Sequence, residues 1–273
     1  MARSTFSQTY GPWAVVTGAS SGIGTAFADE LGRRGLDLVL VARNAERLDA
    51  VARDVRQRHG VRALTVQADL AAPGFLDDLR AATDALDVGL VVSNAGAVSG
   101  GALLRVPAED LTAKARLNVL AHLEIARHYA ERLVERGRGG LLLVSSTMAL
   151  QAVPYAANYS GAKAYILNFG EALNAELRPT GVHATVLLPG PTDTPSVQPG
   201  RDDFDFSNAP MSFQTPEAVV REGLRALERN RPSHVSGTVN RVMAGVGKRV
   251  LSRRASTAMW GALMRRMTLP ARV

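Results

Sequence analysis

Three side chains in the middle of the sequence have the types and the spacing of a proton-transfer group. Tyr159 and Lys163 lie four residues apart, and Ser146 lies thirteen residues before the tyrosine. In a helix, residues i and i+4 share one face, so the lysine ammonium would lie beside the tyrosine phenol. A free phenol has a pKa of about 10, and a neighbouring cation lowers it by roughly 1 to 3 units. Tyr159 is therefore the candidate general acid and base, and Lys163 would bring its pKa towards the working pH.

A glycine-rich turn near the N-terminus has the pattern of a phosphate-binding loop. An apolar segment ends at Thr17, and the residues that follow lead directly into a predicted helix: Gly18, Ala19, Ser20, Ser21, Gly22, Ile23 and Gly24. Glycines allow a tight turn and a close approach of the backbone to a pyrophosphate, which binds at the positive end of the following helix. Alternatively, the segment is only a tight strand-to-helix connection. The strand before it and the helix after it favour the phosphate-binding interpretation.

The Ser-x12-Tyr-x3-Lys spacing together with Thr-Gly-x3-Gly-x-Gly resembles the short-chain dehydrogenase/reductase family. The resemblance covers roughly residues 12 to 195 and implies that hydride passes between a nicotinamide cofactor and a carbonyl carbon. It further implies that Tyr159 exchanges a proton with the carbonyl oxygen, that Ser146 hydrogen-bonds this oxygen, and that Lys163 also binds the nicotinamide ribose. Asn118 matches the family residue that organises a water in the proton relay.

Each of these four residues also has a simpler interpretation. Tyr159 and Lys163 could be a surface pair on a helix, Ser146 a polar strand end, and Asn118 a helix asparagine with satisfied hydrogen bonds. Their joint order and spacing favour the catalytic interpretation. Ser145 adjoins Ser146, but the offset of thirteen residues from the tyrosine selects Ser146.

Cofactor choice is expected to depend on the residues after the second predicted strand. A carboxylate at this position would bind the adenosine ribose hydroxyls of NAD and repel a 2′-phosphate. The sequence has Ala42 and Arg43 instead, and a guanidinium pairs well with phosphate. NADP(H) is therefore favoured over NAD(H), although Arg43 could also be a solvated residue at the start of a loop. Asp37 lies at the other end of this strand and does not favour NAD.

Three further segments fit the family pattern and complete the predicted cofactor site. They contribute Asp69 and Leu70 after the third strand, Asn94, Ala95 and Gly96 after the fourth, and Pro189, Gly190, Thr192 and Thr194 after the sixth. The resemblance implies that Asp69 contacts adenine, that Asn94 braces the sheet, and that Thr192 and Thr194 contact the nicotinamide amide and phosphate. Ser93 stands where the family frequently has Asn. On local grounds, Asp69 could equally be a turn residue.

Short apolar runs alternate with amphipathic stretches, which predicts a doubly wound, mostly parallel sheet of about seven strands with helices on both faces. The predicted strands span residues 13–17, 37–41, 63–66, 89–93, 141–145 and 184–188, with a seventh near 234–236. Asn44 is predicted to cap one helix, Pro73 to lie in the first turn of another, and Thr215 to cap a third. The stretch 107–136 is expected to contain the longest helix, and residues 158–177 the helix that carries Tyr159.

Composition excludes several classes of protein. The chain of 273 residues has no cysteine, and its five histidines lack the close spacing of common zinc sites, so a metal enzyme is not expected. The N-terminus does not resemble a secretory signal, and no apolar run reaches 18 residues, so a soluble cytoplasmic protein is expected. The net charge of +7 is unevenly placed, because residues 231–273 hold nine basic and no acidic residues, whereas residues 1–230 hold 23 basic and 25 acidic ones. Nucleic-acid binding by the whole domain is therefore not indicated.

The substrate is expected to be a lipophilic ketone, aldehyde or acyl-derived carbonyl. Apolar residues lie between Ser146 and Tyr159 and in the long segment 190–214, a candidate lid: Met148, Val153, Tyr155, Phe204, Phe206, Met211 and Phe213. Some of them could be ordinary core or loop residues.

We expect a catalytic domain over residues 1–237 and a basic amphipathic helical tail over 238–273. This tail could cover the substrate entrance, contact a second subunit in a homodimer or homotetramer, lie on an anionic membrane surface, or simply be solvated. The sequence leaves open two alternatives to the enzyme: a non-catalytic NADP-binding regulator on the same fold, or a membrane-surface protein acting through the tail.

Overall fold

A single parallel sheet organises the chain. The computed structural model describes residues 5–98, 100–195, 204, 213–250 and 252–268. Its strands are β1 (Trp13–Thr17), β2 (Asp37–Ala42), β3 (Ala63–Gln67), β4 (Val88–Ser93), β5 (Gly139–Val144), β6 (Val182–Leu188) and β7 (Ser233–Val235). They pair in the order β3-β2-β1-β4-β5-β6-β7, every pair parallel. The predicted doubly wound sheet is confirmed, and the strand order reverses between β1 and β4, where such sheets bind ligands.

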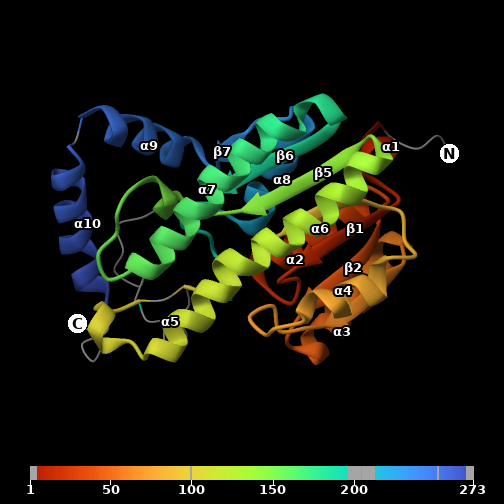
Figure 1. Cartoon of the computed structure of the whole chain (residues 1–273), viewed down its shortest axis with the longest axis horizontal. Helices are drawn as coiled ribbons and strands as arrows, with labels where there is room; N and C mark the ends of the chain where they lie inside the picture. The colour runs from red at the N-terminus through yellow and green to blue at the C-terminus, as the bar shows by residue number, and fades with distance from the viewer. Residues whose placement is uncertain (1–4, 99, 196–203, 205–212, 251, 269–273) are drawn as a thin grey trace.

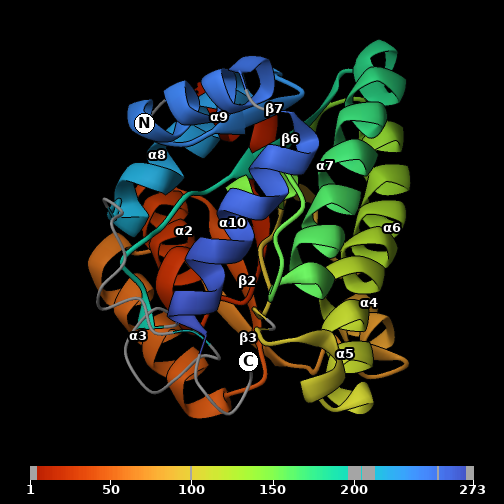
Figure 2. The ribbon, with the colours of Figure 1, turned by 90° about the vertical axis from the view of Figure 1, so that its left-hand side faces the viewer.

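Helices cover both faces of the sheet (Figures 1 and 2). They are α1 (Thr5–Tyr10), α2 (Gly22–Arg33), α3 (Ala45–His59), α4 (Phe75–Thr83), α5 (Ala108–Ala115), α6 (Ala121–Arg136), α7 (Ala157–Leu177), α8 (Pro216–Glu228), α9 (Thr238–Val250) and α10 (Arg253–Met267), with the short turns η1 (Leu103–Arg105), η2 (Arg116–Leu120), η3 (Thr147–Leu150) and η4 (Arg178–Thr180). The apolar sides of α2, α3 and α8 form one core cluster with the sheet, and those of α4, α6 and α7 form others on the opposite face.

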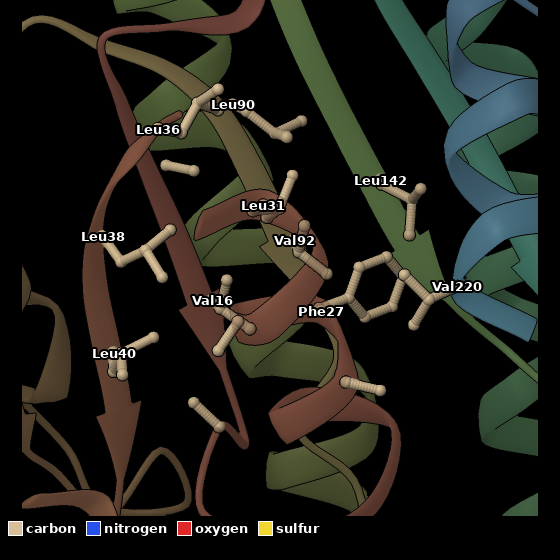
Figure 3. Packing of buried hydrophobic residues seen from close by; sticks show 14 of the residues in the cluster. Val16, Phe27, Leu31, Leu36, Leu38, Leu40, Leu90, Val92, Leu142 and Val220 are labelled. Carbon is tan, nitrogen blue, oxygen red and sulfur yellow. The ribbon is translucent and has the colours of Figure 1, made fainter. Parts of the chain in front are cut away.

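The core beneath α2 shows why the central strands are almost wholly apolar. Phe27 and Leu31 of α2 lie over Val16, Val92 and Leu142 of three neighbouring strands (Figure 3), and all five are fully buried. Strands with a helix layer on each face have no solvent-exposed side, so both sets of alternating side chains must be apolar. This packing fixes the start of α2 against the end of β1.

Local signals in the sequence predicted two of three helix starts correctly. The Asn44 side chain accepts a hydrogen bond from the backbone N–H of Arg47 at 2.8 Å, and Thr215 accepts from Ala218 at 3.3 Å. Pro73 was placed wrongly in a first helical turn, because α4 begins only at Phe75. Gly74 precedes α4 with φ of 82°, a left-handed conformation from which the helix starts two residues after the proline.

The helical stretch within 107–136 also differs from expectation. It consists of α5 and α6 separated by η2, a five-residue π-helical turn, so the longest uninterrupted helix among the described residues is α7 with 21 residues. A π-helical turn inserts an extra residue and redirects the side chains that follow, and it occurs often at functional sites. Here the turn contains Asn118.

The N-terminal helix α1 is an element that sequence reasoning missed. Its Tyr10 is buried in the α2 core, and the phenol oxygen lies 2.7 Å from His183 Nδ1 and 3.3 Å from the Leu227 carbonyl oxygen. The six residues of α1 are too short to show a helical period, which is why their pattern gave no signal.

Helix α7 lies unusually close to the sheet at Gly170. A Cβ atom at this position would lie 2.3 Å from Val186 Cγ2 of β6 and 3.0 Å from Leu143 Cδ1 of β5. Gly161, earlier in the same helix, has nothing within 4 Å of the equivalent point. The glycine at 170 is therefore required by the helix–sheet contact, whereas the one at 161 is not.

We expect Gly170→Ala to lower the free energy of unfolding by about 1 to 3 kcal/mol, because the added methyl group overpacks the interface between α7 and the sheet. The matched control, Gly161→Ala, should raise it by up to about 1 kcal/mol, since alanine favours a helix where space is open. Urea denaturation of the two variants measures both effects. Equal stability of the two variants would contradict the close contact.

Candidate active site

The predicted catalytic residues come from three elements that meet at the carboxyl end of β5. Ser146 follows this strand and caps η3, Tyr159 and Lys163 lie in the first turns of α7, and Asn118 lies in η2. Both η2 and η3 contact α7. The carboxyl ends of parallel strands form the edge at which α/β proteins bind their ligands.

Lys163 is the most buried charged group of this region. Its side chain is 2% exposed, and its Nζ donates a hydrogen bond to the Val144 carbonyl oxygen at 3.0 Å. The same Nζ lies 5.7 Å from the centroid of the Tyr159 ring. Burial lowers the pKa of Lys163 to about 8, because removing an ammonium from water disfavours its charged form. Lys163 therefore remains mainly a cation at neutral pH, next to the tyrosine.

The structure separates the roles of the two adjacent serines. The buried Ser145 hydroxyl donates to the Lys163 carbonyl oxygen at 2.8 Å, which ties β5 to α7. The partly exposed Ser146 hydroxyl oxygen accepts a hydrogen bond from the Met148 backbone N–H at 3.2 Å. Since that contact uses an oxygen lone pair, the Ser146 O–H remains able to donate to another group.

Asn118 and Lys163 both lie close to Gly96. Asn118 is buried; its Nδ2 donates to the Ala97 carbonyl oxygen at 2.7 Å, and its Oδ1 accepts from the Ala97 N–H at 3.2 Å. A Cβ atom on Gly96 would lie 2.8 Å from Asn118 Oδ1 and 3.1 Å from Lys163 Nζ. A side chain at position 96 would therefore displace the lysine or the asparagine, so this position requires glycine.

The glycine-rich turn has the geometry of a dinucleotide cradle. Gly18 and Gly22 have φ values of 67° and 56°, in the left-handed region that favours glycine. A Cβ on Gly24 would lie 2.0 Å from the Gly18 carbonyl oxygen, so the first turn of α2 can approach β1 only without a side chain there. Ser21, at the N-cap of α2, makes no side-chain capping bond. The residues therefore fit a nicotinamide dinucleotide, whose pyrophosphate would accept hydrogen bonds from the first N–H groups of α2.

Asn94 links this cradle to β4. Its side-chain Nδ2 donates to the Thr17 carbonyl oxygen at 2.9 Å, and the Thr17 hydroxyl accepts from the N–H groups of Asn94 and Ala95 at 2.9 and 3.0 Å. A Cβ on Gly18 would lie 2.9 Å from this Nδ2. The ends of β1 and β4 are thus held together at the point where the strand order reverses.

Arg43 and Asp69 lie at the outer side of the cradle. Arg43 is exposed and follows β2 directly, and the Val41 carbonyl oxygen accepts a hydrogen bond from the N–H of Ala19 at 3.2 Å. Asp69 Oδ1 accepts from the Ala71 N–H at 3.1 Å, so the carboxylate serves a turn in the structure, and the neighbouring Leu70 is buried.

The segment after β6 is partly described. Thr192 is buried, and its hydroxyl donates to the Gly190 carbonyl oxygen at 2.9 Å. The Pro189 carbonyl oxygen accepts a hydrogen bond from the Thr147 N–H. The Thr194 side chain lies against Gly22 of the glycine-rich turn. Asn240 of α9 was not predicted here, yet a Cβ on Gly190 would lie 2.2 Å from its Nδ2. No local pattern marks Asn240, because it lies fifty residues away in the sequence.

An apolar cluster lies beside the predicted catalytic residues, and α10 of the tail contributes to it. Phe204, Val153 and Ala156 are buried with Met264 and Met267 of α10, and five more partly buried side chains pack against them: Val98, Met148, Tyr155, Trp260 and Leu263. Phe204 also forms an isolated antiparallel bridge with Thr268. Of the other predicted lid residues, Phe213 is exposed, whereas Phe206 and Met211 lie outside the described residues.

The described residues lack two features, a cluster of metal ligands and a membrane-spanning helix. Among the described residues, no three His, Cys, Asp or Glu side chains gather closely enough to hold a metal ion. Across the part of the chain that the structure describes, every helix is too short or too polar to span a membrane.

The family model of the short chain dehydrogenases matches residues 12–204. The 7beta-hydroxysteroid dehydrogenase of Collinsella aerofaciens is 33% identical over 221 residues, which cover 81% of this chain and 84% of that protein. The very-long-chain 3-oxoacyl-CoA reductase of Mus musculus is 28% identical, covering 85% of this chain and 76% of its own length.

Solved structures agree with these sequence relatives. A 7beta-hydroxysteroid dehydrogenase structure superposes with a TM-score of 0.86 at 29% identity, covering 93% of this chain and 98% of the other. A short-chain dehydrogenase from Sphingobium yanoikuyae in complex with NADPH has a TM-score of 0.78 at 31% identity, covering 87% and 93%. From its cradle, its buried lysine and these relatives, we conclude that the chain belongs to the short-chain dehydrogenase family of oxidoreductases.

Proposed function

We propose that this protein transfers a hydride between NADP(H) and the carbonyl or alcohol carbon of a lipophilic small molecule, with Tyr159 as general acid and base. The observation that carries the proposal is the buried ammonium of Lys163 beside the Tyr159 ring. A cation held out of water at this place stabilises the tyrosinate more strongly than a solvated one would.

The residues around Tyr159 have complementary roles in the proposed reaction. The nicotinamide, when bound, supplies or accepts the hydride. Tyr159 donates its phenolic proton to the carbonyl oxygen during reduction and recovers it during oxidation. Ser146 donates a hydrogen bond to the same oxygen, since its own oxygen already accepts from Met148. Lys163 has three N–H donors, one of which binds Val144, so the others can serve the tyrosine and the cofactor ribose.

A lipophilic substrate is supported by the apolar cluster next to Ser146 and Tyr159. The predicted pocket residues Met148, Val153 and Tyr155 lie in one cluster with Trp260 and Met264 of α10. Two relatives are named for a hydroxysteroid and for a very-long-chain 3-oxoacyl-CoA, each of which carries a large apolar part, the steroid skeleton or the acyl chain. The proposal places α10 at the wall of the substrate pocket.

Tyr159→Phe should lower the rate of NADPH oxidation with a panel of lipophilic ketones by about 10²-fold to 10⁴-fold, the usual contribution of a general acid. NADPH affinity should remain close to that of the unsubstituted enzyme, because the ring stays in place. Stopped-flow absorbance of NADPH measures the rate, and fluorescence titration the affinity.

Tyr165→Phe is the matched control, since Tyr165 lies in the same helix but is 39% exposed. Its ring stacks on Phe169, whereas the Tyr159 ring lies beside Lys163. It should leave the rate unchanged. Full activity of the Tyr159 variant would contradict the mechanism. Tight NADPH binding without turnover of any tested carbonyl in the unsubstituted protein would favour the regulator instead.

We further propose that Arg43 gives the preference for NADP(H), because it is exposed and adjoins the cradle through the Ala19–Val41 hydrogen bond. Arg43→Asp should raise KM for NADPH by about tenfold to a hundredfold, corresponding to the loss of a charge-assisted hydrogen bond of roughly 1.5 to 3 kcal/mol. KM for NADH should fall or stay constant.

Steady-state kinetics with both cofactors checks this expectation. Arg53→Asp makes the same change of charge on the exposed surface of α3, ten residues further along the chain, and should alter neither constant by much. An unchanged ratio of the two KM values in the Arg43 variant would refute the assignment.

One specific observation favours a second property, contact of α9 with an anionic membrane surface. Val239, Val242 and Met243 are 64%, 59% and 63% exposed, and their i, i+3, i+4 spacing places them on one face of the helix. Residues 231–273 contain no acidic residue, so nothing in this segment opposes attraction to anionic lipids. We propose that this stripe inserts at the lipid interface.

The variant Val239→Asp/Met243→Asp should weaken binding to phosphatidylcholine vesicles containing phosphatidylserine by at least about tenfold, since two apolar side chains are lost from the interface. Co-sedimentation measures the binding, with Leu104→Asp as control, because Leu104 is also exposed but lies in η1, outside the basic tail. Equal binding of the α9 variant, or no binding by the unsubstituted protein, would exclude the membrane contact.

A further inference from the structure

A histidine that was not among the predicted site residues is buried near Lys163. His122, the second residue of α6, is 1% exposed. Its Nδ1 lies 2.8 Å from the Ser93 hydroxyl oxygen at the end of β4, and its Nε2 lies 3.0 Å from the Ala95 carbonyl oxygen. No role in the proposed mechanism uses this side chain.

The partners of His122 determine its tautomer. A carbonyl oxygen can only accept, so Nε2 must carry the hydrogen and donate it to Ala95. Burial, and secondarily the nearby Lys163 ammonium, lower the pKa of His122 to about 3, so the ring is neutral at physiological pH. Nδ1 of a neutral ring with Nε2–H is an acceptor, and the Ser93 hydroxyl therefore donates to it. Ser93, His122 and Ala95 form a directed chain of two hydrogen bonds.

This chain completes the attachment of the turn after β4 to the rest of the site. The Thr17 hydroxyl oxygen accepts hydrogen bonds from the N–H groups of Asn94 and Ala95. The Asn118 side-chain amide binds both backbone polar groups of Ala97. His122 secures the remaining carbonyl of Ala95 from the helix that follows Asn118. Gly96 lies between these hydrogen-bonded residues, and Lys163 Nζ and Asn118 Oδ1 lie so close to it that no Cβ atom fits there.

We infer that His122 is a positioning residue, which with Ser93 holds the Ala95–Gly96 backbone in the conformation that supports Lys163 and receives the cofactor. This protein thus has Ser93 where the family frequently has asparagine, and His122 links this serine to the Ala95 carbonyl oxygen. The inference rests on the proposed function for its effect on turnover, but its effect on cofactor affinity is independent of any substrate.

The test compares NADPH affinity, measured by fluorescence titration, in variants that keep or remove the hydrogen bonds. His122→Leu fills a similar volume but leaves Ser93 and Ala95 without their partner; it should weaken NADPH binding by about tenfold to a hundredfold, as loss of an outer hydrogen bond does at other ligand sites. His122→Gln can still donate from its amide Nε2 to Ala95 and should bind NADPH nearly as tightly as the unsubstituted protein.

Two further variants separate positioning from general destabilisation. Ser93→Ala should weaken NADPH binding, and adding it to His122→Leu should cause little further loss, because both changes break one chain. His128→Leu removes another histidine of the same helix, one that contacts the Tyr129 ring far from the turn, and should leave affinity unchanged.

The inference would be overturned if His122→Leu bound NADPH normally, if the Gln variant were as impaired as the Leu variant, or if the Ser93 and His122 effects were additive. Should the Leu variant fail to fold, the Gln and Ser93 variants still decide the matter. If NADPH affinity follows these expectations while no carbonyl is reduced, the positioning role stands and only the proposed reaction fails.

Discussion

The buried ammonium of Lys163 is the constraint on which the rest of the site depends. Holding a cation with 2% exposure costs free energy, and the structure offsets it with the Val144 carbonyl oxygen and the closely packed turn around Gly96. The ammonium lies among the ends of β4 and β5, helix α7 and η2. The position of the lysine constrains these elements: the Ser145 hydroxyl bonds β5 to α7, and only glycine fits at position 96 after β4.

The same constraint explains why α7 and the π-helical turn have their observed form. Helix α7 can bring Lys163 to the end of β5 only if its later turns lie close to the sheet, and Gly170 permits that approach. The turn η2 interrupts a helical stretch, and within it the buried Asn118 hydrogen-bonds to both backbone polar groups of Ala97. The irregular helical turn lies in the region where a charged group is buried, as is common at functional sites.

The sequence predicted the parts of this arrangement that have a local cause. Six apolar runs indicated the strands because buried parallel strands need them, and Asn44 and Thr215 indicated helix starts through their own capping bonds. Pro73 misled because a left-handed Gly74 delays the helix, and the interruption at Asn118 has no compositional mark. The role of His122 depends on partners 27 and 29 residues away, and Asn240 approaches Gly190 across fifty residues, separations that no local pattern reveals.

The two ends of the site consequently follow different physical rules. At the cofactor end, backbone geometry sets the requirements: glycines with φ of 67° and 56°, a helix start without a side-chain cap and an asparagine bridge between β1 and β4. Few residue types satisfy these, so the motif is readable in the sequence. At the apolar end, Phe204 and Met264 need only volume and hydrophobicity, and many residues provide both. Under the proposed function, the tail can therefore reshape the apolar wall through α10 while the proposed proton-transfer group, fixed by burial of its lysine, stays unchanged.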